Sequence, residues 1–195
     1  MNGENIQKQI AFIVEVDKIK HIFRHSRLFD SSRYENASEH SWTACLLAVL
    51  LKDCSNTEIN LERVLIMLLI HDIVEIDAGD TFLYSKDRQF AFEKELIAAE
   101  RIFGILNTDQ KKNYMDLWVE FEDRQTAEAK FAAVCDRLEP ILQNYLNQGA
   151  IWKKHNITRK QVIEKNRHIA EGSEEIWSYV ECLIEESVKQ GYLED

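Results

Sequence analysis

A histidine and an aspartate stand side by side at the end of the most apolar run in the chain. The run at residues 64–70 leads directly into His71 and Asp72. Burying an imidazole beside a carboxylate costs free energy unless both groups find partners. One interpretation is a histidine that is satisfied within the core. The other is a pair of ligands for a divalent cation, which both side chains suit.

Two further polar residues interrupt segments that otherwise have apolar, helical spacing. Asp136 lies within the stretch 131–138, although aspartate is a poor helix former and is rarely buried without a partner. It is therefore either half of an ion pair or a ligand that points into a helix bundle. His40 lies in the same helical frame as Ala44 and Leu47, so it is expected to face inward.

Two acidic residues follow the His71–Asp72 pair closely. Glu75 comes four residues after His71, so the two share one face if the helix continues. Asp80 follows a glycine at a break in the pattern. Carboxylates beside a metal-activated water can take or direct its proton, whereas solvated surface charge is the plain alternative for both residues.

The candidate ligands form a set of two imidazoles and two carboxylates: His40, His71, Asp72 and Asp136. This donor set suits Mn, Fe, Co, Ni or Zn better than Mg or Ca, which prefer oxygen ligands alone. The four residues belong to three predicted helices that are far apart in the sequence. A helix bundle can bring such positions together in its core.

Helical periodicity over most of the chain predicts an all-α fold of about seven or eight helices. A single proline, Pro140, and only six glycines favour long helices with short connections. We expect a single domain over residues 1–195, with core motifs at about 15–145 and a C-terminal helical extension over 146–195. Helices are expected over 4–24, from Asn36 or Ser38, from Asn60, over 87–106, from Thr108, over 126–149 and from Thr158 to the end.

The segments between these helices read as turns rather than strands. No stretch shows the clear apolar–polar alternation of a half-buried strand. Residues 29–35 are predicted to be a loop that turns at Asp30, Ser31 and Ser32. Asn36 can cap the next helix, with Glu39 as the acidic partner of a capping box.

The composition argues against several classes of ligand and several cellular locations. The net charge of −10 and the pI of about 5.1 argue against a nucleic-acid polymer as partner, while a small phosphorylated ligand stays compatible with a bound cation. The four cysteines include no C-x-x-C pair, so we expect reduced thiols. The polar N-terminus has no signal-peptide pattern, and no apolar run is long enough to span a membrane. A cytoplasmic protein is expected.

Three stretches around these residues resemble the HD-domain metal-dependent phosphohydrolases, whose signature is H…HD…D, and in particular their 5'-deoxynucleotidase-like branch. The stretches are residues 33–42, residues 69–81 and residues 129–140. The resemblance extends over about residues 15 to 145. It implies that the four candidate ligands hold one divalent transition metal per chain: His40, His71, Asp72 and Asp136.

The same resemblance implies roles for the neighbouring residues. Glu75 corresponds to the residue that activates water, and Asp80 to a residue beside the substrate and the nucleophilic water, with Thr81 next to it. The implied reaction is hydrolysis of a deoxyribonucleoside 5'-monophosphate to a deoxynucleoside and phosphate. The metal would lower the pKa of a water and polarise a phosphoryl oxygen. A homodimer is also implied.

The family further uses an arginine upstream of the first histidine to orient the phosphate. The candidates in this sequence are Arg24, Arg27 and Arg33, of which Arg24 is preferred and Arg33 is retained as a second substrate-binding candidate. An arginine suits this task because its planar guanidinium can donate two parallel hydrogen bonds to a phosphate.

Four alternatives stay open at this point. The substrate could be a cyclic nucleotide or a pyrophosphate. The chain could be a non-catalytic metal-binding interaction module, or its metal site could be a closed structural one. A two-metal HD protein, as in oxygenases with two irons, would need extra histidines before the final aspartate, but residues 73–135 contain none. One metal per chain is therefore favoured.

Overall fold

Helices build almost the whole architecture of this chain, for which a computed structural model describes residues 3–85 and 91–195. Within these residues, eight helices have seven residues or more, which confirms the all-α prediction and its helix number. The elements, with η for 3-10 helices, are α1 Gly3–Val16, η1 Asp17–His21, β1 Phe23–Arg27, β2 Tyr34–Asn36, α2 Ala37–Leu51, η2 Lys52–Cys54, α3 Leu61–Ile70, α4 Glu75–Ala78, α5 Ala91–Phe103, α6 Thr108–Asp123, α7 Ala127–Leu146, α8 Ala150–Lys154, α9 Arg159–Asn166, α10 Ile169–Gly172 and α11 Glu174–Lys189.

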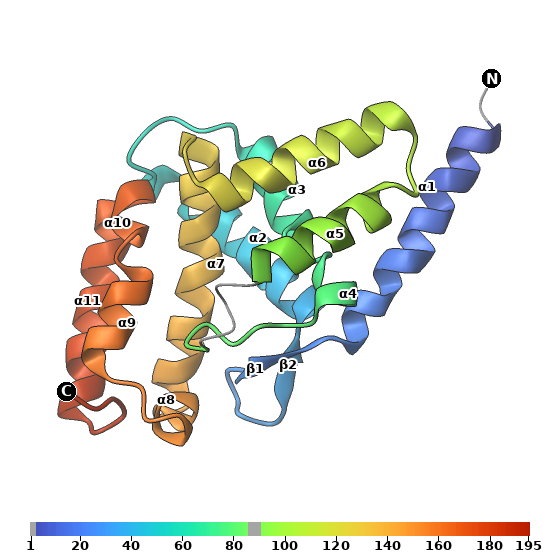
Figure 1. Cartoon of the computed structure of the whole chain (residues 1–195). Helices are drawn as coiled ribbons and strands as arrows, with labels where there is room; N and C mark the ends of the chain where they lie inside the picture. Colours follow the sequence, from blue (N-terminus) through green and yellow to red (C-terminus); the bar gives the residue numbers. More distant parts are fainter. Residues whose placement is uncertain (1–2, 86–90) are drawn as a thin grey trace.

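Helix α7 is the central element of the bundle. It packs against α2 and α3 on one side and against α10 on the other, with α6 also in contact (Figure 1). Thr126 caps its first turn by accepting a hydrogen bond from the backbone of Ala129, as predicted, and the helix continues through Pro140. Asp136 therefore sits midway along a helix that is surrounded by neighbours, which forces its carboxylate into the interior.

The first turn of α2 is fixed by the predicted capping box. The Asn36 side chain accepts from the backbone N–H of Glu39, and the Glu39 carboxylate accepts from the backbone N–H of Asn36. These two bonds satisfy donors that a helix start leaves free. They also set the rotation of the helix so that His40, one residue later, faces α7 and is fully buried.

The prediction of one helix over residues 4–24 was wrong at its C-terminal end. The α-helix ends at Val16, a 3-10 turn follows, and Phe23–Arg27 forms a strand that pairs antiparallel with Tyr34–Asn36. Its inward-facing side chains are Arg24 and Ser26, so the strand buries polar groups and lacks the apolar alternation by which strands are recognised. The predicted turn at residues 30–32 connects the two strands.

The prediction of one long helix from Thr158 was also wrong in part. Thr158 does cap a helix, but the segment is divided into α9, α10 and α11. Ser173 has extended backbone, caps α11 through Ile176 and donates its hydroxyl to the carbonyl of Cys54. Gly172 lies so close to α7 that a β-carbon there would stand 2.7 Å from the carbonyl oxygen of Lys130. This close approach requires glycine at the last position of α10.

Two smaller differences concern helix starts. Asn107, one residue before the predicted Thr108, caps α6 through the backbone N–H of Gln110. The helix predicted over 87–106 is described from Ala91 to Phe103, and its predicted start at residues 87–90 lies outside the described residues. Among the helices that the structure describes, none has the length and apolar character needed to cross a bilayer.

Candidate metal centre

Three segments of the chain, one of them in α7, bring the four predicted ligands together. His40 comes from the first turn of α2, His71 and Asp72 follow the end of α3, and Asp136 projects from α7. The Oδ1 atom of Asp136 lies 3.0 Å from Nε2 of His40 and 3.7 Å from Nε2 of His71. Asp72 Oδ1 lies 3.1 Å from His71 Nε2. All four side chains are buried.

The orientation of His71 is the observation that fits a cation best. Its Nδ1 lies 2.9 Å from the carbonyl oxygen of Leu68, which can only accept, so the proton sits on Nδ1. The lone pair of Nε2 then points at the carboxylates of Asp72 and Asp136. Nothing among the described residues forms a hydrogen bond with this buried atom. A positive group between Nε2 and these carboxylates would satisfy all three, and two imidazoles with two carboxylates form a donor set that suits a divalent transition metal.

Neighbouring side chains shift the pKa values of His40 and Asp136 in opposite directions. Burial alone would lower the pKa of His40, and Arg24 acts in the same direction. Hydrogen bonds to Asp136 and Glu139 outweigh both and raise this pKa to about 10. Burial would raise the pKa of Asp136, but Arg137 and the two histidines hold it well below its usual range. A divalent ion would displace the His40 proton and take over its charge.

A cavity of about 370 Å³ opens beside these ligands. Seven of the nine predicted site residues line it: Arg24, His71, Asp72, Glu75, Asp80, Thr81 and Asp136. His40 lies beneath the surface of the cavity. The volume of the cavity falls within the range of small-molecule pockets in proteins, which is roughly 300–1,000 Å³.

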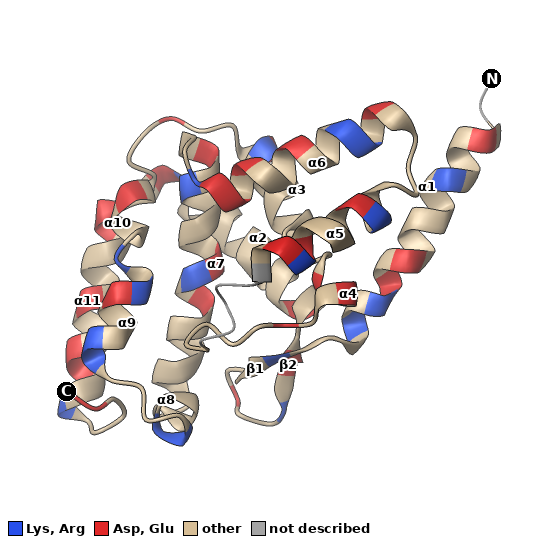
Figure 2. Ribbon diagram, in the orientation of Figure 1, with Lys and Arg blue, Asp and Glu red and all other residues tan. Residues whose placement is uncertain are grey.

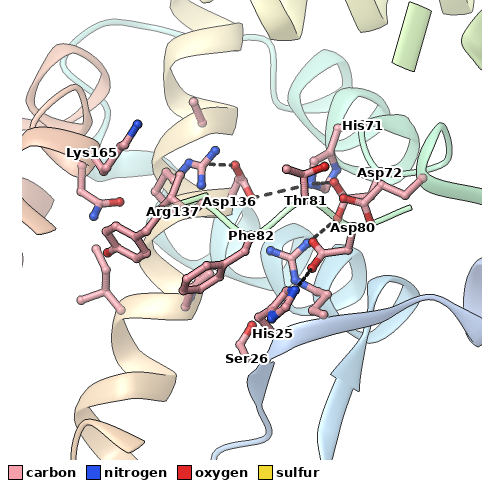
Figure 3. Close-up of a pocket in the computed structure, with 18 of the residues that line it drawn as sticks. His25, Ser26, His71, Asp72, Asp80, Thr81, Phe82, Asp136, Arg137 and Lys165 are labelled. Carbon is pink, nitrogen blue, oxygen red and sulfur yellow. Dashed lines mark hydrogen bonds and ion pairs between the residues drawn. The ribbon is translucent and has the colours of Figure 1, made fainter. Parts of the chain in front are cut away.

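Glu75 and Asp80 occupy one wall of this cavity. Glu75 opens the short helix α4, and burial together with the neighbouring Asp72 raises its pKa well above the usual range. Its Oε2 atom is buried without a hydrogen bond among the described residues. Gly79 has φ 76° and ψ 153°, a conformation essentially restricted to glycine, and this turn directs Asp80 into the cavity. Figure 3 shows Asp80 and Thr81 beside Asp72.

The two predicted arginines have different positions. Arg24 lines the cavity, and its Nη1 donates a 2.6 Å hydrogen bond to Oδ2 of Asp72. Its side chain is only 11% exposed. Arg33 does not line the cavity but pairs with Glu39 at the surface end of the hairpin. The substrate-binding prediction for Arg33 is therefore not supported by its position, because the capping glutamate holds it away.

Several cavity residues had no assigned role in the sequence. Arg137 lies beside Asp136, with its Nε 3.3 Å from Oδ2 of that residue, and Lys165 projects from α9 on the side of Arg137 (Figure 3). Phe82 lies between Arg137 and His25 in Figure 3, and its ring centroid is 4.9 Å from that of His25. Arg137 follows a candidate ligand directly, which is a usable signal. Phe82 and His25 carry no such signal, because the loops that hold them meet only in the fold.

A second group of buried acids lies behind the ligands. Glu139 Oε2 is 2.6 Å from Nδ1 of His40, and the Nε2 of Gln143 donates to Glu35 Oε1 over 2.8 Å. Burial and the neighbouring Glu139 raise the pKa of Glu35 to about 8. Glu139 stands one helical turn after Asp136, so the spacing alone could have placed both acids on one face.

The helical bundle, with an H…HD…D set of side chains beside a pocket, has the features of an HD domain. The HD domain model matches residues 16–177, and the chain belongs to the HD domain family. HD domains bind divalent metals, and the chain is a metal-dependent phosphohydrolase of this type.

The relatives with assigned activities are similar at moderate identity. The human protein named 5'-deoxynucleotidase HDDC2 is 29% identical over 146 residues, which is 73% of this chain and 69% of the human protein. The fission yeast protein named 5'-deoxynucleotidase hdd1 is 25% identical over 151 residues, covering 74% of this chain and 75% of the yeast protein.

A solved structure is more similar over the full length. The crystal structure of a protein described as a predicted metal-dependent phosphohydrolase from Magnetospirillum magnetotacticum MS-1 superposes with a TM-score of 0.95 at 44% identity. It covers 98% of this chain and 97% of its own. An HD-domain phosphohydrolase from Listeria innocua, at 18% identity and a TM-score of 0.60, shares the fold, covering 92% of this chain and 85% of its own.

Proposed function

We propose that this chain hydrolyses deoxyribonucleoside 5'-monophosphates to deoxynucleosides and phosphate, with one divalent transition metal held by His40, His71, Asp72 and Asp136. The observation that carries this proposal is the buried Nε2 of His71, which forms no hydrogen bond among the described residues and faces the carboxylates of Asp72 and Asp136 beside the cavity. The names of the human and yeast relatives support the nucleotide as substrate. The two imidazoles favour Mn, Co, Ni, Fe or Zn over Mg.

The chain's own residues divide the chemistry among them. A divalent cation at this site supplies Lewis-acid polarisation of a phosphoryl oxygen and lowers the pKa of water. Glu75 and Asp80 accept and direct the proton of the attacking water, because both carboxylates line the same wall. The water oxygen bonds to phosphorus, the bond from phosphorus to the sugar oxygen breaks, and the departing sugar oxygen takes a proton. Arg24 neutralises charge on the phosphate.

The cavity and the charge of the chain support a small substrate. Acidic residues are interspersed among the basic ones along the helices in Figure 2, and the net charge of −10 disfavours a phosphate polymer as ligand. Inside the cavity, Arg24 pairs with Asp72 and Arg137 pairs with Asp136. These two guanidinium groups supply positive charge within a lining that has more acidic than basic residues, beside the proposed metal ligands where a single phosphate would bind.

A phosphate-release assay tests this proposal. The protein is stripped of metal, reloaded separately with Mn, Co, Ni, Zn, Fe and Mg, and given ribo- and deoxyribonucleoside 5'-monophosphates. We expect metal-dependent release from the 5'-deoxynucleotides, lost together with bound metal in Asp72→Ala and His71→Ala. No release from any of these nucleotides by a protein that still binds one metal per chain would move the substrate elsewhere within the family. A metal-free, inactive wild type would favour an interaction module.

We further propose that the chain forms a homodimer through the outer face of α2. Trp42 is 66% exposed and Leu50 is 68% exposed, and Leu46 and Val49 are also exposed between them. The helix carries no charged side chain from Ser41 to Leu51, so two copies can approach there despite their net charge. Light scattering after gel filtration should give twice the chain mass, and Leu50→Glu should give a monomer. A monomeric wild type would refute the dimer.

A further inference from the structure

A row of fully buried polar side chains lies behind the metal centre, on the side away from the cavity. Glu35, Glu139 and Gln143 are each 1% exposed, and none of the three lines the cavity. Acidic residues are almost never buried this deeply without a specific partner. The row therefore needs an explanation that neither solvent nor substrate contact can give.

The shortest contact in this row ends on a candidate metal ligand. Oε2 of Glu139 lies 2.6 Å from Nδ1 of His40, and Nε2 of the same ring lies 3.0 Å from Oδ1 of Asp136. A carboxylate is an acceptor, so Glu139 keeps the proton on Nδ1. Nε2 is then the nitrogen of this ring that faces Asp136 and the proposed metal site.

Glu139 is itself held in place from two directions. Its backbone belongs to α7, one turn beyond Asp136, and Nε2 of Gln143 lies 3.5 Å from its Oε1. The same amide donates to Glu35, whose Oε2 is 3.6 Å from Nε of Arg24. The buried row thus connects the ligand His40 with the arginine that lines the cavity. A rotation of Glu139 would disturb both.

The row is too tight to be a second cation site. Glu35, His40 and Glu139 offer three ligand atoms within 4.8 Å of one another. A metal bonded to both Nδ1 and the Glu139 oxygen at roughly 2.0–2.2 Å would normally hold these atoms about 3 Å apart. The observed 2.6 Å is instead the length of a charge-assisted hydrogen bond between the two atoms.

We infer that Glu139 is a positioning residue that fixes the tautomer and ring orientation of His40, with Gln143 and Glu35 holding Glu139 in turn. The inference rests on the proposed metal site. Outer carboxylates that accept from a ligand imidazole fix its orientation and raise its basicity, and their removal typically weakens metal binding about 10- to 100-fold. Glu139 touches neither substrate nor metal, so it acts only through His40.

The test measures Mn²⁺ binding to the whole chain by competition with a chelating dye. Glu139→Leu should weaken Mn²⁺ binding about 10- to 100-fold. Glu139→Gln keeps the volume and an acceptor oxygen but loses the charge, so it should fall between Glu139→Leu and wild type. Val180→Ala, in the buried face of α11 and away from the site, serves as a control that lowers stability without changing Mn²⁺ affinity.

A second readout follows the tautomer directly. In the Zn²⁺-loaded protein, nitrogen-15 spectra of the histidine rings should show His40 with a protonated Nδ1, and Glu139→Gln should shift that proton. Unchanged Mn²⁺ affinity in both Glu139 variants, or Zn²⁺ bound through Nδ1, would overturn the inference while leaving the metal site intact. A wild type that binds no Mn²⁺, or binds two ions per chain, would overturn both.

Discussion

Replacing Arg24 with methionine should lower the folding stability of the protein and increase its affinity for metal. The guanidinium lies 2.6 Å from Asp72 and is only 11% exposed, so its removal leaves a buried carboxylate without a cation. Breaking a buried pair in this way costs about 3–5 kcal/mol. Glu35, the other neighbour, has a pKa of about 8 and is mostly protonated at pH 7, so only one charge loses its partner. We therefore expect Arg24→Met to lower the free energy of unfolding by about 3 kcal/mol without metal.

A bound divalent ion changes this value because it supplies the missing positive charge beside Asp72. If saturating Mn²⁺ reduces the loss from about 3 to about 1.6 kcal/mol, linkage requires that Arg24→Met bind Mn²⁺ about tenfold more tightly than wild type. Turnover should nevertheless fall, because a charge-assisted hydrogen bond to phosphate contributes roughly 1.5–3 kcal/mol. Arg24→Lys should recover much of the stability but little of the turnover, since it lacks the planar pair of donors.

Urea unfolding in EDTA and in Mn²⁺, followed by dye competition for metal affinity, measures these effects. Arg33→Met is the matched control, because it removes the same side chain from the same hairpin but breaks an exposed pair with Glu39. Exposed pairs contribute only about 0–1 kcal/mol, so this variant should keep its stability in both solutions and its turnover. An Arg24→Met variant with the same loss in EDTA and Mn²⁺, and wild-type metal affinity, would refute the reasoning.

Three further predictions follow from other parts of the structure. Glu75→Ala should keep one metal per chain, measured by elemental analysis, and lose at least about 100-fold in turnover; loss of the metal as well would exclude a role as base. Burial, Arg137 and Arg124 lower the pKa of His168 to about 4, so its contribution to stability is present above pH 6.5 and is lost as pH falls towards 4. After allowance for partial solvent screening this loss is about 1–2 kcal/mol, and His168→Gln should remove it from acid titrations of the unfolding free energy. Gly172→Ala should cost at least about 1–3 kcal/mol in urea unfolding, because the new methyl group meets a backbone carbonyl of α7, and full retention of stability would contradict that packing.

Local chemistry explains which parts of the fold could be predicted. The capping residues Asn36, Asn60, Thr126 and Thr158 all cap helices in the structure, because a side-chain oxygen bonding to a nearby backbone N–H is a short-range interaction. The candidate ligands were recognisable for a similar reason. An imidazole or carboxylate inside an apolar helical run is costly, and that cost is visible in the sequence itself.

Long-range contacts explain what could not be predicted. The strand at Phe23–Arg27 buries Arg24 and Ser26 against the site, so its inward side is polar and imitates an exposed segment. The close approach of Gly172 to α7, beside the break before Ser173, is a long-range contact that no local sequence pattern records. Likewise, Arg24 pairs with Asp72 beside the cavity and Arg33 pairs with Glu39 at the surface, and which acid each arginine meets is known only from the fold.

Anomalous diffraction from Mn²⁺-soaked crystals tests the central claim most directly. We predict one strong peak per chain, bounded by Nε2 of His40, Nε2 of His71 and carboxylate oxygens of Asp72 and Asp136, and absent in His71→Ala. A peak between His40 and Glu139, or no peak beside His71 in a protein that is active with Mn²⁺, would contradict the account.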